Sequence, residues 1–222
     1  MFRWLRRIIS FIVIAHIIYL LALKFIFPPI TLTQLQAWTN QKEWNRKYVS
    51  YHDMSPHIKW AVIASEDQKF ASHNGFDIPV IKKLWKEKNN NKKLRGGSTI
   101  SQQTAKNVFL WQKRSWIRKG LEVYFTILIE WIWGKERILE IYLNSIEMGP
   151  GVFGIEAASQ KYFNKSAKNL NAQEAAQIAA ILPNPKVYRA APPSPYIQKR
   201  STWILRQVKQ LKGNPDLEKL IN

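Results

Sequence analysis

The 222-residue sequence has no cysteine, only four histidines, and 15 acidic residues against 34 Lys and Arg. Without cysteine it can form neither a disulfide framework nor a thiolate metal site, and the histidines include no pair at zinc-binding spacing. The shortage of acid leaves a formal net charge of +19, which excludes an acidic or neutral cytosolic domain. Because 46% of the residues are hydrophobic and 13% aromatic, a content that disordered polycations lack, we expect a folded chain.

The longest apolar run covers residues 8–27 and is broken by only three polar or charged side chains. Twenty residues of α-helix rise about 30 Å, which matches one hydrocarbon core. Three arginines lie within residues 1–7, so the positive-inside rule predicts a cytoplasmic N-terminus and an exported chain after Pro28. A cleaved signal peptide is the alternative, but its apolar region is shorter and ends at small residues, which this run does not do. We therefore expect a single transmembrane helix at 8–27.

The exported part is also basic, because only four of the 34 basic residues and none of the acidic ones precede Pro28. Such a charge is typical of nucleic-acid-binding proteins. A domain that is held at a bilayer and points away from the cytoplasm does not meet DNA, so we expect no nucleic-acid partner. Anionic lipid headgroups or pyrophosphates are the favoured partners.

Helical periodicity dominates the exported part, with few alternating, strand-like runs and no internal repeat. Residues 28–54 are expected to form a juxtamembrane linker, and residues 55–222 one mainly α-helical domain. The polar, basic segment 87–95 is expected to be a mobile loop, and the five prolines of 183–195 exclude a helix there. The expected helices cover residues 57–70, 99–111, 118–133, 135–144, 155–163, 172–182 and 196–211.

The first candidate site contains Glu66. On a helix, Glu66 would share one stripe with three apolar residues spaced four apart, namely Ile58, Val62 and Phe70. Desolvation there would raise the pKa of Glu66 and suit it to proton transfer near neutral pH. The alternative is that Glu66 lies at the edge of the stripe, solvated or paired with Lys69.

The second candidate site is the segment 95–107, which contains two adjacent glycines. Thr99 is a good helix N-cap residue, and Gln102 three residues later completes a capping box. Thr99, Gln103 and Lys106 lie at i, i+4 and i+7, so a hydroxyl, an amide and an ammonium share one helix face. A helix N-terminus with a cation two turns further on favours binding of an anion. Simple capping with a solvated polar face is the alternative.

The third candidate site is the segment 114–131. Arg118 and Lys119 precede Glu122 by four and three residues, so the three charges can converge on one patch of a helix. Base before acid is the less stabilising order on a helix, which favours function over surface pairing. The segment 108–117 mixes tryptophans with Lys and Arg, which favours contact with a membrane interface. Packing of the tryptophans in the core is the alternative.

Five motifs occur in the order found in glycosyltransferase family 51, and together they cover most of the exported part. They are EDQKFASHNGFD at 66–77, GGSTISQQTAKN at 96–107, RKGLE at 118–122, KERILEIYLN at 135–144 and ILPNP at 181–185. The chain resembles the monofunctional members, since its length and the absence of Ser-x-x-Lys and Lys-Thr-Gly exclude the bifunctional penicillin-binding proteins. The resemblance implies a mainly α, lysozyme-like, bilobed domain.

The resemblance also implies an activity: polymerisation of lipid II into glycan strands, with inversion at C1 of MurNAc and release of undecaprenyl pyrophosphate. By position in the motifs, Glu66 is expected to be the general base that deprotonates the acceptor hydroxyl. Glu122 is expected to support departure of the pyrophosphate, directly or by helping to hold a divalent metal. The implied substrate-binding residues are Asp67, Phe70 and His73 on the acceptor side, Thr99, Gln103 and Asn107 around the donor, and Lys106, Arg118 and Lys119 on the pyrophosphate.

The partners implied by the resemblance are lipid II, the growing lipid-linked glycan strand and other cell-wall synthesis proteins. The chain is expected in the bacterial inner membrane, with the catalytic domain periplasmic. No cofactor is required with certainty; a divalent cation, Mg²⁺ or Mn²⁺, is left open, and its ligands are unknown.

Two other classes of function compete with this one. A lytic transglycosylase would share the glutamate and the lysozyme-like helices, but it would have little use for the Lys106, Arg118 and Lys119 cluster. A non-catalytic membrane scaffold would tolerate the loss of Glu66 and Glu122, both of which are present.

Overall fold

The computed structural model describes residues 2–40, 44–88 and 97–221, which form a mainly α-helical molecule, as predicted. The helices are α1 (Phe2–Ala22), α2 (Leu32–Asn40), α3 (Pro56–Glu66), α4 (Ile78–Lys88), α5 (Ile100–Phe109), α6 (Trp116–Ile132), α7 (Lys135–Ser145), α8 (Ile155–Phe163), α9 (Ala172–Ile181), α10 (Pro195–Leu211) and α11 (Pro215–Ile221). Short 3-10 helices cover Tyr51–Asp53, Phe70–Ser72 and Ala167–Asn169, and the strands are β1 (Asn45–Arg46), β2 (Glu147–Gly149) and β3 (Val152–Phe153).

The helices predicted from periodicity are present, and most begin and end within a few residues of their expected limits. The prediction of a helix through Phe70 is wrong, because α3 ends at Glu66 and Asp67 leaves the helical region with φ −161°. Helices α2, α4 and α11 were not predicted. Of the segment 87–95, the first two residues end α4 and the rest lies outside the described residues.

The N-terminal helix differs in position from the expected range 8–27. It begins at Phe2 and ends at Ala22, because the next four residues form turns with main-chain bonds such as that from Lys24 N to Leu21 O. Two prolines follow at 28 and 29 and prevent the helix from resuming.

The core lies where α3, α9 and α10 pack together and where α5 packs on α6 and α7. Helix α3 starts with Pro56 in its first turn, and the Ser55 hydroxyl caps it by accepting from His57 N. Every residue from Ile58 to Ala64 is buried, since other helices surround α3. The packing fixes the C-terminal end of α3, where Glu66 lies.

A small sheet ties the segment before α3 to the segment after α7. Its strand order is β1-β3-β2, with β1 parallel and β2 antiparallel to β3. Beside it, the Asn144 amide exchanges two hydrogen bonds of 2.9 Å with the main chain of Val49. Gly154 has φ +86°, and an added Cβ would lie 2.7 Å from Asn144 O, so only glycine fits there.

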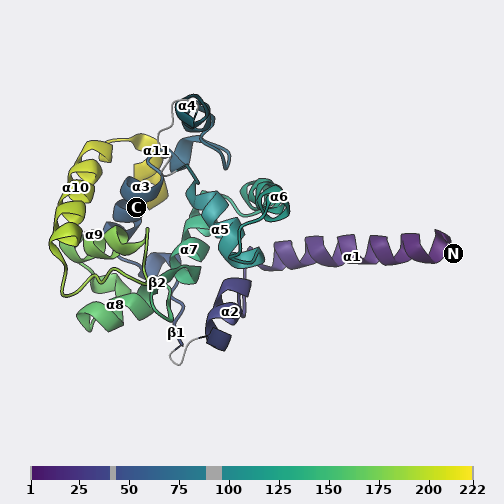
Figure 1. Cartoon of the computed structure of the whole chain (residues 1–222), viewed down its shortest axis with the longest axis horizontal. Helices are drawn as coiled ribbons and strands as arrows, with labels where there is room; N and C mark the ends of the chain where they lie inside the picture. The colour runs from purple at the N-terminus through teal and green to yellow at the C-terminus, as the bar shows by residue number, and fades with distance from the viewer. Residues whose placement is uncertain (1, 41–43, 89–96, 222) are drawn as a thin grey trace.

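Helix α1 projects from the rest of the molecule, and its C-terminal end meets the body beside α6 (Figure 1). By length and composition it is the one helix among the described residues that could cross a membrane. Trp133 and Arg137 hold its end by donating to the main-chain oxygens of Leu20 and Leu23, at 2.9 and 3.0–3.1 Å. His16, a polar residue inside the apolar run, packs against aromatic rings of α6.

Helix α6 carries an exposed apolar face next to α1. Trp116 and Trp131 are 92% and 83% exposed, and Ile117 and Ile127 between them are exposed as well. Packing of Trp116 in the core, the alternative for the segment 108–117, is therefore wrong. Exposed tryptophan and aliphatic side chains on one helix face are typical of contact with a membrane interface.

Candidate active site

Glu66 is the last residue of α3 and lines a cavity of about 310 Å³. Burial raises the pKa of its carboxyl above the ordinary value, as the sequence predicted. Of the predicted apolar stripe, however, only Ile58 and Val62 lie on the same helix as Glu66, because α3 ends before Phe70. The alternative pairing with Lys69 is wrong, since Lys69 instead lies 3.5 Å from the Asp77 carboxylate.

Two residues fix the Glu66 carboxylate from α5 and α7. Gln103 Nε2 donates to Glu66 Oε2 at 2.8 Å, while Gln103 Oε1 accepts from the buried Tyr142 hydroxyl at 3.2 Å. Because the tyrosine occupies the amide oxygen, the amide nitrogen is the atom turned toward Glu66. This hydrogen bond, and the charges of Arg200 and Lys106, partly oppose the rise in the Glu66 pKa.

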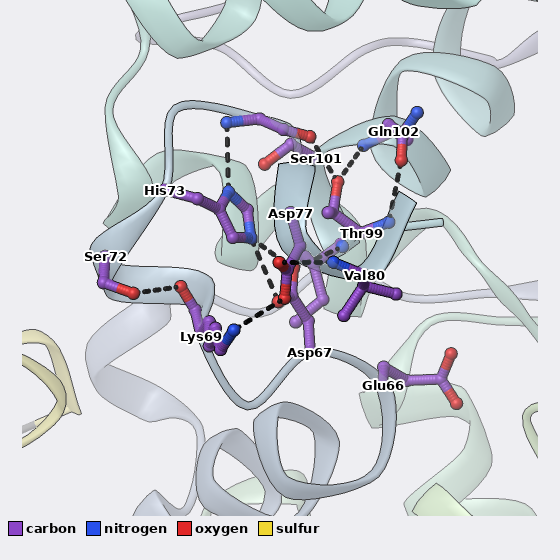
Figure 2. A network of polar contacts seen from close by, with 12 residues as sticks. Glu66, Asp67, Lys69, Ser72, His73, Asp77, Val80, Thr99, Ser101 and Gln102 are labelled. Carbon is purple, nitrogen blue, oxygen red and sulfur yellow. Dashed lines mark hydrogen bonds and ion pairs between the residues drawn. The ribbon is translucent and has the colours of Figure 1, made fainter. Parts of the chain in front are cut away.

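Asp67, the residue after Glu66, links three segments of the chain. Its carboxylate oxygens each lie 3.0 Å from His73 Nε2, and Oδ2 also accepts from the main-chain N of Ile100 at the start of α5. His73 Nδ1 accepts from Gly75 N, so the ring hydrogen is on Nε2 and is donated to Asp67. Figure 2 shows Asp67 and His73 meeting while Glu66 points away from them. Asp67 and His73 therefore position the ends of α3 and α5 beside Glu66.

Thr99 and Phe70 are structural in this arrangement. The Thr99 hydroxyl donates to Gly75 O at 2.6 Å and accepts from Gln102 N, so the capping box is formed (Figure 2). Phe70 is fully buried, with the Lys135 ammonium 4.6 Å from its ring centroid. Thr99 is buried, and it lines the Glu66 cavity from the start of α5.

Lys106 stands one turn after Gln103 on α5, and both line two further cavities, of about 420 and 380 Å³. Among the described residues its ammonium has no hydrogen-bond or ion-pair partner. Burial, and then the neighbouring cations Arg118, Lys119 and Arg114, lower the pKa of Lys106, against the opposing effect of Glu122. Asn107 lines the larger cavity and accepts from Gln112 at 3.2 Å.

The predicted convergence on α6 is present in the smaller of these cavities. Arg118 Nη1 donates to Glu122 Oε2 at 2.8 Å, and Lys119 Nζ donates to Oε1 of the same buried carboxylate. Arg118 Nε is buried without a protein partner among the described residues. Glu122 thus neutralises part of the charge and holds two cations at the wall of a cavity that Lys106 and Arg114 also line. The arrangement suits an anion with several oxygens.

The side chains that line this cavity do not suit a divalent cation. Both oxygens of Glu122 already accept from cationic side chains, and the surrounding charges are positive. Within the described ranges no group of three or more His, Asp or Glu could hold a metal ion. The positive charges that can face an anion in this cavity are the side chains of Lys106, Arg114, Arg118 and Lys119.

The three cavities share walls around the start of α5. Ser98 lines both the Glu66 cavity and the cavity of about 380 Å³ that holds the four cations. Gln103 and Lys106 line that cavity and also the larger one, which reaches the segment 182–186. Four residues that line these cavities or act on Glu66 were not predicted from the sequence to belong to the site. They are Arg114, Tyr142, Arg200 and Trp203. Arg114 lies in the candidate segment 114–131 and Tyr142 in the motif at 135–144, whereas the sequence of α10 carries no signal of a site.

Fold and site together define a helical enzyme in which a carboxyl of raised pKa lies near a cavity lined by four cationic side chains. A family model described as transglycosylase matches residues 32–209. Three similar proteins are each named biosynthetic peptidoglycan transglycosylase. That of Shewanella oneidensis is 45% identical over 99% of this chain and 95% of its own length. Those of Bacteroides thetaiotaomicron and Pseudomonas aeruginosa are 47% and 43% identical, over 98% and 99% of this chain and 90% and 97% of their own lengths.

The chain therefore belongs to the transglycosylase family and is a glycosyltransferase, which confirms the family that its five motifs resemble.

Proposed function

We propose that this enzyme polymerises lipid II into peptidoglycan glycan strands at the outer face of the bacterial inner membrane. The observation that carries the proposal is the arrangement along α5. Gln103 holds the Glu66 carboxylate, and Lys106 one turn later enters a cavity lined by three further cations. A base beside a polyanion site is what glycosyl transfer from a pyrophosphate-linked sugar requires.

The first step of the proposed reaction is activation of the acceptor. The GlcNAc 4-hydroxyl of an incoming lipid II lies in the Glu66 cavity and loses its proton to Glu66 as it attacks C1 of the donor MurNAc. A carboxyl whose pKa is raised by burial is a stronger base than an exposed one. Attack from the face opposite the leaving group gives inversion at C1.

The second part of the reaction is departure of undecaprenyl pyrophosphate. Because this leaving group carries its own negative charge, it needs cations more than it needs an acid. Lys106, Arg114, Arg118 and Lys119 supply them, and Glu122 keeps Arg118 and Lys119 in place. The polyprenyl chain stays in the bilayer, which α1 crosses and which the exposed face of α6 contacts.

The test uses the full chain in detergent with labelled lipid II, and compares wild type with Glu66→Gln. The wild type should give a ladder of polymer that muramidase digests, and the variant should lose at least about a hundredfold in rate. Glu136→Gln, an exposed glutamate at the start of α7, is the matched control and should polymerise normally. Unchanged lipid II with degraded sacculi would support the lytic class, and no change in either would support the scaffold.

A further inference from the structure

An aromatic side chain forms part of the Glu66 cavity and has no role in the chemistry above. Trp203 on α10 lines this cavity and keeps 36% of its surface exposed. Of the described residues that line the cavity, it is the one aromatic residue. The other lining groups beside Glu66 are mostly polar or small, such as Ser65, Gln68 and Ser98.

Two neighbours on the same face of α10 fix Trp203 in this place. Arg200 precedes it by three residues, and its guanidinium carbon lies 4.2 Å from the centroid of the indole ring. Gln207 follows by four residues and accepts at 3.0 Å from Gln68 Nε2, next to the end of α3. Arg200 thus contacts the indole itself, and Gln207 attaches the next turn of α10 to the segment that follows Glu66.

Arg200 also connects the tryptophan to the catalytic carboxyl. Its charge acts on Glu66, and its Nε is buried without a protein partner among the described residues. Arg200 therefore contacts the indole ring and also acts on Glu66. Through Arg200, the orientation of the indole is linked to the position at which the acceptor hydroxyl must lie.

We propose that Trp203, held by Arg200, is the platform on which the acceptor sugar packs in the cavity beside Glu66. This inference rests on the proposed function. The C–H faces of a pyranose ring are apolar and pack on an indole, while the ring hydroxyls point to the polar groups at the edge. Such a platform would set the height of the 4-hydroxyl relative to Glu66, so Trp203 is a specificity-determining residue for the acceptor.

The kinetic test measures elongation rate against lipid II concentration for wild type, Trp203→Leu and Trp203→Phe. Loss of the aromatic face should raise the apparent KM for lipid II about tenfold, with kcat changed less than about threefold, and should shorten the strands. Trp203→Phe, which keeps a ring, should recover most of the affinity. Trp44→Leu is the matched control, because Trp44 is 40% exposed and lines none of these cavities.

A second readout does not depend on polymerisation. Saturation-transfer NMR with N,N′-diacetylchitobiose should show transfer to the disaccharide from wild type and Trp44→Leu, and much less from Trp203→Leu. Circular dichroism of each variant checks that it is folded. Equal transfer from wild type and Trp203→Leu, no transfer from wild type, or a fall in kcat with unchanged KM would each overturn the platform. Disaccharide binding that depends on Trp203, in a wild type that makes no polymer, would instead overturn the proposed function.

Discussion

At the scale of single residues, the balance of forces on Glu66 decides the pH at which the enzyme works. Burial raises its pKa, and the Gln103 hydrogen bond stabilises the charged form and opposes that rise. As the proposed general base, Glu66 must be deprotonated, so activity should be lost as the pH falls through its pKa. Lys106 must stay charged to bind an anion, and because burial lowers its pKa, it limits activity on the alkaline side.

Gln103→Leu should therefore move the acid limb of the kcat/KM profile to higher pH and leave the alkaline limb in place. The reason is that the carboxylate loses its donor, so its charged form becomes less favourable. The profile is measured with labelled lipid II from pH 5 to pH 10. Gln198→Leu, on the exposed side of α10, should give the wild-type profile. An acid limb that stays in place in Gln103→Leu would contradict the assignment of Glu66 as the base.

At the scale of elements, the site depends on how the first turn of α5 is attached to the end of α3. Asp67 accepts from Ile100 N, and a carboxylate at this helix N-terminus also interacts favourably with the helix dipole. Thr99 completes the attachment by capping α5 and bonding Gly75 O. Gly75 has φ +88°, and an added Cβ would lie 2.7 Å from the Thr126 side chain. The Thr99 bond to Gly75 O and this close packing therefore hold the loop before α4 against the start of α5.

Thr99→Ala should lower the free energy of unfolding by about 1–2 kcal/mol, because it removes both the cap and the bond to Gly75. Thr99→Ser, which keeps the hydroxyl, should retain most of that stability. Denaturant unfolding of the full chain in detergent measures both. Thr202→Ala, on an exposed part of α10, is the control and should change stability by less than about 0.5 kcal/mol. Wild-type stability in Thr99→Ala would show that the hydroxyl serves another purpose.

The elements that the sequence could predict are those with a local signal. Periodicity located the long helices, and the spacing of Thr99 and Gln102 predicted the capping box that the structure contains. The end of α3 was missed because an apolar residue at position 70 continues the helical spacing, whereas the turn that breaks it depends on the long-range bond from Ile100 to Asp67. The strands were missed because two or three residues carry no readable alternation. Trp203 was missed because only the packing of α10 on α3 brings it to Glu66.

At the scale of the whole molecule, the apolar surfaces share one side. Helices α1 and α6 meet, with His16 against the rings of Tyr124 and Phe125, and α10 lies at the opposite edge (Figure 1). Arg137 links the end of α1 to α7, and Glu140 on α7 accepts from Arg137 and from Tyr51 N near the start of α3. The end of the proposed anchor is therefore bonded directly to a helix that contributes to the site. With α1 in the bilayer, as proposed, such a connection would hold the cavities at a fixed height above it.

The proposed function requires one orientation of the chain in the membrane. The arginines within residues 1–7 predict a cytoplasmic N-terminus, which leaves α10 and the cavities outside the inner membrane. Because the chain has no cysteine, single cysteines report orientation without background. In spheroplasts a membrane-impermeant maleimide should label Lys212→Cys at once, and should label Trp4→Cys only after permeabilisation; both positions are exposed. The opposite pattern would put the site in the cytoplasm, and labelling of both without permeabilisation would show that α1 does not span the membrane.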